Sequence, residues 1–468
     1  MLFTSNVFLY YFLPLVLALY YGVPRSWKPW ILALSSYFFY GWWRPDFVAL
    51  MWFSTVVDYS CGLGIQRDRE RPGAGATAGR RFVALSCAVN LGLLAYFKYA
   101  NFGIETLNKL LESQGHAPIA WAQVLLPIGI SFYTFQTLSY TIDVYRRDAE
   151  PVRQFRDFAC YVALFPQLIA GPIVRYRSVA EQLKSRVHTW SGFSTGVLIF
   201  QAGLAKKVLL ADTFAQAADQ GFALANPTTI EAWVAALSYT LQIYFDFSGY
   251  SDMAIGLGLL FGFRFPINFN RPYISKSITE FWRRWHITLS SFLRDYLYIP
   301  LGGNRKGSAR THVNLALTML LGGLWHGAAW TFIAWGAYQG FWLVLERLSG
   351  RRTLYAMLPG VLQSAVTLVI VTVGWVLFRA DTLPEALHFL RAMAGGGPGE
   401  AATLFIEWSQ LQTIAYVAAP IILFGCATTQ EHAKNPRPWW TATVFVLFLM
   451  SLLHLHRASN IPFLYFQF

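Results

Sequence analysis

Apolar segments about as long as a membrane is thick recur along this chain. They lie near residues 7–24, 29–44, 47–65, 82–100, 123–143, 193–211, 233–250, 312–327, 329–347, 359–378, 411–427 and 439–456. A helix needs roughly 20 mostly apolar residues to cross the hydrocarbon core, where all its backbone polar groups must be satisfied internally. The pattern predicts an all-α, polytopic membrane bundle of about 11–13 spans, folded as one integral membrane domain over residues 1–468.

Composition supports the same fold class. Hydrophobic residues make up 55% of the chain and charged residues 13%, which is roughly half the charged share of a soluble domain. The formal net charge of +13 falls in short loops, so it indicates cytoplasmic loops and not nucleic-acid binding. The four cysteines show no CxxC or Cys–His spacing, so we expect neither a disulfide framework nor a metal site.

Loop charge predicts the orientation of the spans. The loops 66–81, 145–156, 264–310 and 346–353 are basic, and the loops 101–122, 212–232 and 379–410 carry more acidic than basic residues. The first group is expected in the cytoplasm and the second outside. The apolar N-terminal stretch lacks a basic n-region and a small-residue cleavage site, so we expect it to stay as the first membrane helix.

Residues 158–175 interrupt the regular alternation of spans. This apolar segment contains Pro166, Gly171 and Pro172, and basic residues end and follow it. A full crossing would carry those charges outside, whereas a broken or re-entrant helix keeps them inside. Irregular backbone at membrane depth is tolerated where protein buries it or it lines a cavity. The alternative is an ordinary span with a proline kink.

One histidine, His326, lies in the apolar run MLLGGLWHGAAW at 319–330, directly after Trp325. An ionisable group in such a run is a functional-site candidate because it is costly there unless it is paired or faces a water-filled cavity. Histidine also has an unperturbed pKa near neutrality, which suits a general acid or base. The alternative is a structural histidine bonded to a neighbouring helix.

The segment 277–298 has helical spacing, with aromatic residues on one face and arginines on others. It predicts an amphipathic helix at the inner membrane surface, capped by Ser277 or Thr279. Arg283 and Arg284 would attract a phosphorylated donor such as a nucleotide-containing thioester, or else anionic lipid.

Three further features of the polar segments are His286, the sequence Gly302-Gly303-Asn304 and two aspartates. His286 is expected to be a solvated or structural histidine in that interfacial setting, and Gly302, Gly303 and Asn304 form a turn signal. Asp246 and Asp252 lie in the aromatic segment LQIYFDFSGYSDMAIG. At that depth each carboxylate needs a partner, which means orienting a histidine, pairing with an arginine or forming an interhelical salt bridge.

Several long sequence segments occur along the chain in one order. They are YFKYANF at 96–102, LPIGISFYTFQ at 126–136, FPQLIAGPIVR at 165–175, YFDFSGYSDMAIGLG at 244–258, ITEFWRRWHITLSSFLRDYLYIPLGGNR at 278–305 and LLGGLWHGAAWTFIAWG at 320–336. Together they resemble the membrane-bound O-acyltransferase family, and within it the branch that acetylates bacterial alginate and cellulose. The resemblance implies a helix bundle around a tunnel. It also implies that His326 is catalytic and that His286 matches a second polar site. The substrate-binding candidates are Arg283, Arg284, Trp285, Asp246, Asp252, Asn304 and Trp325.

The resemblance also implies a function. Acetyl-CoA would be the acetyl donor, with no bound cofactor or metal. The acetyl group would pass to a separate, SGNH-like extracytoplasmic acetyltransferase working with a polysaccharide synthesis complex at the cell inner membrane. The partners are then membrane lipid and these proteins, and not nucleic acid. One alternative is the same chemistry on peptidoglycan or teichoic acid. The other is a sugar or lipid transporter, which twelve or so spans would suit but for which the sequence offers no internal repeat.

Overall fold

The structure, a computed structural model, describes the chain except residues 351–352, 398–409, 458–462 and 465–468. The described residues form helices and connecting segments with no β-strand, which confirms the all-α prediction. They divide into two compact units. The first comprises Met1–Val197 with Ala254–Pro266, and the second Leu198–Met253 with Ile267–Phe468. The expectation of one integral membrane domain stays a prediction.

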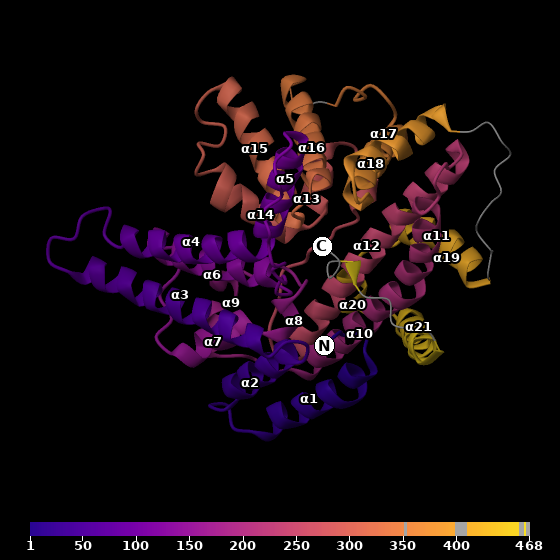
Figure 1. The fold of residues 1–468 in the computed structure, drawn as a ribbon. Helices are drawn as coiled ribbons and strands as arrows, with labels where there is room; N and C mark the ends of the chain where they lie inside the picture. Colours follow the sequence, from indigo (N-terminus) through magenta and orange to yellow (C-terminus); the bar gives the residue numbers. More distant parts are fainter. Residues whose placement is uncertain (351–352, 398–409, 458–462, 465–468) are drawn as a thin grey trace. The chain divides into compact units, whose positions relative to one another are not determined.

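The first unit holds the N-terminal helices, which are coloured indigo to magenta in Figure 1. They are η1 (Val7–Phe12), α1 (Leu13–Gly22), α2 (Lys28–Gly41), α3 (Asp46–Glu70), α4 (Arg80–Leu94), η2 (Ala95–Tyr99), α5 (Ala100–Ser113), α6 (Ile130–Arg146), α7 (Phe155–Ala163), α8 (Phe165–Leu168) and α9 (Tyr176–Lys184). Two further helices, α10 (Trp190–Ala205) and α12 (Thr229–Leu260), contribute residues to both units.

The second unit holds the remaining helices. They are η3 (Lys206–Ala211), α11 (Asp212–Phe222), η4 (Pro272–Ile274), α13 (Ile278–Arg284), α14 (Ile287–Leu293), η5 (Arg294–Tyr298), α15 (Ser308–His326), α16 (Trp330–Leu348), α17 (Gly360–Arg379), α18 (Leu383–Arg391), η6 (Ala392–Gly396), α19 (Gln410–Pro420), η7 (Ile421–Gly425), α20 (Thr429–Lys434) and α21 (Pro438–Arg457). Among these, α15 and α16 form a hairpin joined by a short turn.

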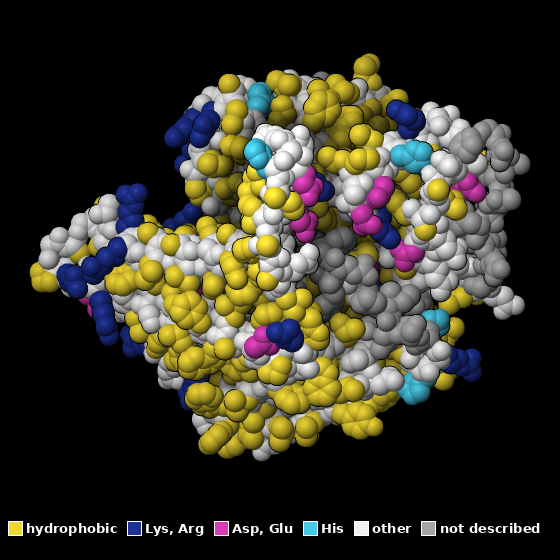
Figure 2. All heavy atoms as spheres, in the orientation of Figure 1, with side chains coloured by type: hydrophobic (Ala, Val, Ile, Leu, Met, Phe, Trp, Pro, Cys, Tyr) yellow, Lys and Arg dark blue, Asp and Glu magenta, His cyan; other side chains and the backbone are white. Residues whose placement is uncertain are grey.

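Each predicted span falls on a helix, but not all of those helices are long and apolar. Within the described residues, five are both long and apolar enough to cross a membrane, namely Asp46–Glu70, Arg80–Ser113, Trp190–Phe222, Gly360–Arg379 and Pro438–Arg457. Shorter apolar helices cover Val7–Gly22 and Gln410–Gly425. Figure 2 shows hydrophobic side chains over much of one face of the molecule. Such extensive exposed apolar surface is rare on a soluble monomer and fits contact with lipid.

The predicted span at 123–143 needs a correction at its start. Helix α6 begins only at Ile130, and the residues just before it are not helical. Pro127 and Gly129 explain this start, because Gly129 has a left-handed backbone with φ of 80°. A Cβ atom there would also lie 2.9 Å from the Leu168 carbonyl oxygen. Glycine is the residue that tolerates such a conformation and such a close approach.

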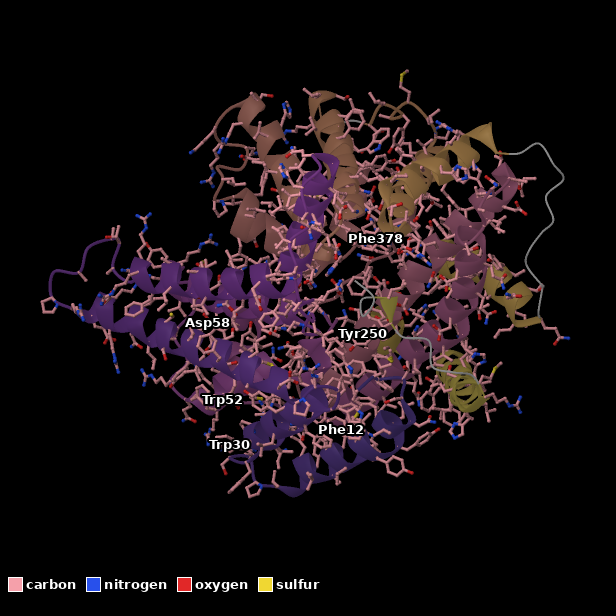
Figure 3. The ribbon with its side chains drawn as sticks, viewed as in Figure 1. Phe12, Trp30, Trp52, Asp58, Tyr250 and Phe378 are labelled. Carbon is pink, nitrogen blue, oxygen red and sulfur yellow. The ribbon has the colours of Figure 1, made fainter. Side chains whose placement is uncertain are left out.

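Polar side chains buried in the first unit pair with one another. Asp58 of α3, labelled in Figure 3, accepts hydrogen bonds from Ser86 Oγ at 2.6 Å and from Asn90 Nδ2 of α4 at 2.8 and 3.0 Å. Thr137 of α6 donates to Asn90 Oδ1 at 3.2 Å. Three helices are therefore held together by an interhelical network in which Asp58 is bound by neutral donors.

The prediction of a broken helix at 158–175 is confirmed. Helix α7 ends at Ala163, the short α8 covers Phe165–Leu168, and residues up to Arg175 are irregular. At Gly171 a Cβ atom would lie 2.7 Å from Gln167 Cα, so only glycine fits the turn. The segment is buried throughout, as irregular backbone in a membrane protein must be unless it lines a cavity.

Candidate functional site

The hairpin of α15 and α16 positions His326. His326 is the last residue of α15, and α16 begins at Trp330. The two helices touch through glycines. A Cβ atom on Gly323 would lie 2.3 Å from the Phe332 carbonyl oxygen, and one on Gly336 would lie 2.5 Å from that of Met319. Small residues let helix backbones approach closely, and this packing leaves His326 buried at the turn of the hairpin.

The predicted amphipathic helix over 277–298 is not continuous. Ser277 caps α13, its Oγ accepting from the Glu280 N–H at 2.9 Å, as expected. The helix then breaks at His286, which has a left-handed backbone with φ of 42°. Backbone pairing explains the break. The Arg284 carbonyl accepts from the Asn270 N–H, and the Ile287 N–H donates to the Asn268 carbonyl, each at 2.9 Å. A neighbouring segment thus takes the bonds that a continuous helix would use.

His286 is fully buried, so of the two expected alternatives the solvated histidine is wrong and the structural one agrees with the structure. Its Nδ1 lies 3.1 Å from Asn268 Oδ1, which also accepts from the Thr288 N–H at 3.3 Å and from Thr288 Oγ1 at 2.9 Å. A backbone N–H can only donate, so this oxygen is an acceptor and His286 Nδ1 donates to it. The basic nitrogen of the neutral ring is therefore Nε2.

The electrostatic setting of His286 favours the neutral imidazole. This residue lies between two short helices, outside the helices long and apolar enough to cross a membrane. Burial lowers the pKa of His286 to about 3, because a charged ring would lose its hydration there. The ring is thus an uncharged hydrogen-bonding group at physiological pH.

The structure brings His286 and His326 together from two separate helical segments, with ring centroids 6.4 Å apart. Aromatic rings surround the pair, mostly edge-on. His326 lies 5.1 Å from Trp325, 5.2 Å from Trp335 and 5.2 Å from Phe378. His286 lies 4.7 Å from Phe247. Phe378 is labelled in Figure 3. An imidazole in such an enclosure can accept and return a proton, which is a role open to His326, and the neutral ring of His286 beside it can accept a hydrogen bond through Nε2.

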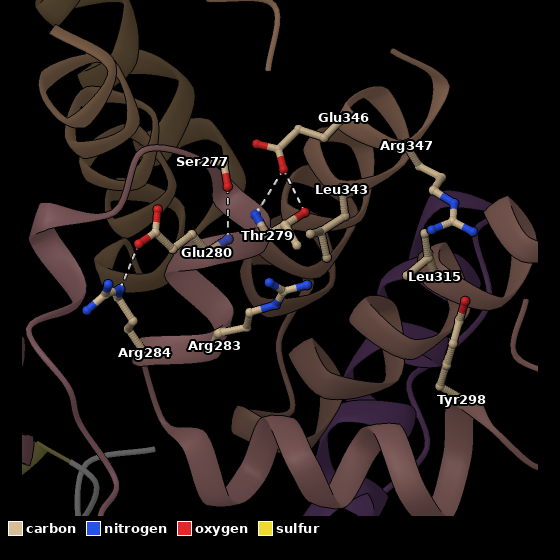
Figure 4. A pocket seen from close by; sticks show the side chains of 10 residues that line it. All are labelled: Ser277, Thr279, Glu280, Arg283, Arg284, Tyr298, Leu315, Leu343, Glu346 and Arg347. Atoms are coloured by element: carbon tan, nitrogen blue, oxygen red, sulfur yellow. Dashed lines mark hydrogen bonds and ion pairs between the residues drawn. The ribbon is translucent and has the colours of Figure 1, made fainter. Parts of the chain in front are cut away.

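A cavity of about 900 Å³ opens beside α13 in the same unit. Figure 4 shows its lining, which consists of Ser277, Thr279, Glu280, Arg283, Arg284, Tyr298, Leu315, Leu343, Glu346 and Arg347. Arg284 Nε pairs with Glu280 at 2.9 Å, whereas Arg283 and Arg347 have no carboxylate within 4.0 Å among the described residues. The predicted arginines thus line a cavity large enough for a sizeable anionic ligand.

One carboxylate shapes this cavity. Glu346, at the end of α16, accepts from the Ile278 N–H at 2.7 Å, from the Thr279 N–H at 2.9 Å and from Thr279 Oγ1 at 2.7 Å. Glu346 therefore anchors the first turn of α13, the helix whose last turn contains Arg283. Charge-assisted bonds of this kind are roughly twice as strong as neutral ones.

The cavity and the histidines lie at different points along the hairpin. Leu315 precedes His326 by eleven residues on α15, which at 1.5 Å per residue is about 16 Å. Leu343 follows Trp335 by eight residues on α16, or about 12 Å. A ligand that fills the cavity must therefore extend along the hairpin to reach His326.

The aspartates form ion pairs with lysines. Asp246 pairs with Lys207 at 2.8 Å and accepts from the Leu464 N–H at 2.9 Å. Asp252 pairs with Lys206 at 2.7 Å. Of the alternatives that the sequence left open, the interhelical salt bridge is the one observed.

Two other candidates lie away from the cavity. Asn304 is exposed on the turn formed by Gly302 and Gly303, whose φ angles are 112° and 54°. Trp285 is buried against Trp375, with ring centroids 4.9 Å apart. Neither is among the residues that line the cavity.

Sequence reasoning missed several residues of this region, chiefly Asn268, Phe247, Glu346, Lys206 and Lys207. Glu346 had a usable signal, because it is the one acidic residue of α16. Asn268 had none, since it reaches His286 through tertiary folding. Among the described residues, no three His, Cys, Asp or Glu side chains gather as they would around a metal ion.

Comparison with known proteins decides the family. Residues 122–376 match the membrane-bound O-acyltransferase (MBOAT) family. This chain belongs to that family. It is 48% identical to a probable alginate O-acetylase, AlgI, of Pseudomonas putida, over 100% of both chains. It is 36% identical to a peptidoglycan O-acetyltransferase of Helicobacter pylori, over 100% of this chain and 98% of that one. A teichoic acid D-alanyltransferase of Streptococcus thermophilus is 32% identical over 47% of this chain and 56% of its own.

Family membership makes this protein a multi-pass membrane enzyme, an O-acyltransferase. The broken helix, the hairpin carrying His326 and the segment carrying His286 all lie within the matched residues.

Proposed function

We propose that this O-acyltransferase takes an acetyl group from acetyl-CoA at the cytoplasmic face of the inner membrane and delivers it for O-acetylation of an exopolysaccharide. The support is full-length similarity, at 48% and 45% identity, to probable alginate O-acetylases of Pseudomonas putida and Pseudomonas aeruginosa. Alginate is the first polymer to test and cellulose the second. Peptidoglycan is the competing acceptor, with support from the relative at 36% identity.

The observation that carries the chemistry is the buried pair of His326 and His286, 6.4 Å apart in an aromatic enclosure. In the proposed step His326 takes the proton of an acceptor hydroxyl, whose oxygen attacks the thioester carbon. A C–O bond forms, the C–S bond breaks, and the thiolate receives the proton from His326. Nε2 of His286 accepts a hydrogen bond that orients the acceptor.

The cavity supports a phosphorylated donor. Arg283 and Arg347 lack a carboxylate partner among the described residues, and guanidinium groups bind phosphate oxygens well. In the proposal the nucleotide end of acetyl-CoA occupies the cavity. Its pantetheine arm then follows α15 toward His326 over about 16 Å, which brings the thioester to the histidines. Acetyl-CoA is a substrate here, and the proposal needs no bound cofactor.

The acceptor side of the proposal involves partners. The acetyl group passes to an SGNH-like extracytoplasmic acetyltransferase, which esterifies the polymer in concert with the polysaccharide synthesis complex. The relatives' names support polymer acetylation as the end result. The partners themselves follow from the resemblance of the sequence.

The test begins with purified protein in lipid vesicles, supplied with radiolabelled acetyl-CoA and a soluble acceptor alcohol. We expect thioester loss matched by acetyl ester formation. Uptake of a sugar or lipid into the vesicles without thioester cleavage would contradict the proposal and favour a transporter. In cells, deletion of the gene should remove acetyl groups from the exopolysaccharide. Loss confined to peptidoglycan would reassign the acceptor.

A further inference from the structure

A cluster of cations lies in the first unit, at the ends of apolar helices. Lys28 begins α2, just after the apolar stretch Val7–Gly22. Arg186 and His188 lie just before α10, which starts the candidate span Trp190–Phe222. Helix ends of this kind mark the boundary between hydrocarbon and water.

Tyr20 ties these segments together. Its buried hydroxyl donates to the Phe261 carbonyl at 2.9 Å, lies 2.9 Å from His188 Nε2 and accepts from Arg186 Nε at 3.0 Å. The hydroxyl has one proton, which goes to Phe261, so His188 must donate to it through Nε2. Both lone pairs of Tyr20 are then in use, and the position of Arg186 is fixed.

The ammonium group of Lys28 faces aromatic rings. Its Nζ lies 4.5 Å from the ring centroid of Tyr20 and 5.0 Å from that of Tyr21. The guanidinium of Arg186 lies 4.7 Å from the ring of Phe263. Such contacts hold a cation in place and partly dehydrate it.

Among the described residues no carboxylate lies within 4.0 Å of either cation, and the acidic group that the charge of Arg186 affects, Asp157, lies beyond that distance. Both side chains are half-buried, and Lys28 donates no hydrogen bond within that part of the chain. The charges also affect a neighbour. Burial, followed by the positive charges of Lys28 and Arg186, lowers the pKa of His188. Two fixed like charges raise the free energy of the protein unless an anion lies between them.

The surroundings of the cluster fit a membrane interface. Trp27, Trp30 and Trp190 are 59%, 41% and 82% exposed, and Figure 3 labels Trp30 on α2. Exposed tryptophans are typical of the level of the lipid headgroups. Basic pockets between membrane helices at this level bind anionic headgroups.

We propose that Lys28 and Arg186 bind the phosphate of an anionic phospholipid headgroup at the membrane boundary. The ammonium supplies a point charge and the guanidinium directed N–H donors, a combination suited to a phosphodiester. The acyl chains of the same lipid lie against the exposed apolar side chains of α1 and α2, among them Leu15 and Leu34. The bound lipid thereby joins the ends of α1, α2 and α10.

The test uses the full-length protein in an uncharged detergent, titrated with phosphatidylglycerol and, in separate samples, with phosphatidylcholine or inorganic phosphate. Native mass spectrometry measures the bound lipid. The variant Lys28→Gln removes a side chain that makes no protein hydrogen bond among the described residues, so it should fold. We expect it to bind phosphatidylglycerol about fivefold more weakly, since one basic residue near a lipid surface contributes on the order of 1 kcal/mol. Adding Arg186→Gln should weaken binding further.

The matched control is Lys184→Gln combined with Arg71→Gln. Each of these exposed residues already has a carboxylate within 4.0 Å, Glu181 at 3.1 Å and Asp68 at 3.4 Å, so the control should bind lipid as the parent does. Equal loss in the control and in Lys28→Gln would overturn the proposal. So would parental binding by Lys28→Gln, or equal binding of phosphatidylcholine. If millimolar inorganic phosphate displaced all of the bound phosphatidylglycerol, the site would be one for free phosphate and not for lipid.

Discussion

The second unit has two buried polar regions, one around Lys206 and Lys207 and one around His286 and His326. They look alike in sequence and differ in structure. Both place ionisable residues in apolar, aromatic segments. Around Lys206 and Lys207 each charge faces an opposite charge, with Asp252 at 2.7 Å and Asp246 at 2.8 Å. Around His286 and His326 the neighbours are aromatic rings and the Asn268 amide. The two regions thus contain buried ionisable residues of two kinds. The ion pairs hold helices together, and the histidine pair has the uncharged surroundings that the proposed proton transfer requires.

The difference predicts separate effects on activity and stability. His326→Gln should lower acetyl transfer by about 10²–10⁴-fold, because the amide cannot take up and return a proton. Its thermal unfolding midpoint should stay near that of the parent. The matched control is His116→Ala, at an exposed position, which should keep parental activity. Acetyl transfer near the parental rate in His326→Gln would remove the general base from the proposed mechanism.

The lysine region should respond in the opposite way. Lys207→Met leaves Asp246 and Asp212 buried without their cation, and breaking a buried pair from one side typically costs about 3–5 kcal/mol. We expect a lower unfolding midpoint in detergent, with any activity loss following the loss of folded protein. The double variant Lys207→Met with Asp246→Asn should recover part of that stability. A stable but inactive Lys207→Met protein would place this region in the reaction.

The cavity arginines should affect donor binding more than chemistry. Arg283→Ala with Arg284→Ala should raise the half-saturating acetyl-CoA concentration, since charge-assisted bonds are worth about 1.5–3 kcal/mol each. Arg283 should contribute more, because Arg284 already pairs with Glu280 at 2.9 Å. Arg305→Ala, at an exposed loop position, is the control. An unchanged half-saturating concentration per folded molecule would leave these arginines as membrane anchors.

The smallest effect concerns pH and His286. Its pKa is about 3 in the folded protein, below the ordinary value of about 6.5 for an unfolded chain. The contribution of the neutral His286 ring to the free energy of unfolding is therefore fully present above pH 6.5. It is lost as the pH falls toward 3. Between pH 6.5 and 5 the free energy of unfolding of the parent should fall by on the order of 1 kcal/mol per pH unit, compared with that of His286→Gln. Parallel stability curves for the two proteins would show that His286 titrates normally.

Sequence was a good guide to what local patterns determine. Hydrophobic stretches located the helices, Pro166 and Gly171 marked the broken segment, and Ser277 marked the start of α13. It was a poor guide to what distant residues determine. The helical spacing of 277–298 is real, yet pairing with the segment at Asn268 breaks the helix at His286.

The residues of the candidate site also fall into those that local sequence reveals and those that it does not. His326 and Arg283 were found because their residue types stand out from their own surroundings. Glu346, Asn268 and Phe247 were missed because their contacts join segments far apart in the chain. The exposed position of Asn304 and the packing of Trp285 were likewise not readable from local sequence.

The glycine contacts between α15 and α16 have a consequence for how the enzyme is assembled. Three residues separate these helices, so their contacts are local and should form early during membrane insertion. The approach of His286 to His326 spans forty residues of sequence and requires docking of a finished hairpin onto another segment. In the proposed mechanism the enzyme therefore acquires its capacity for proton transfer late in biogenesis. A nascent protein in which the hairpin has formed but not docked would not yet catalyse the proposed acetyl transfer.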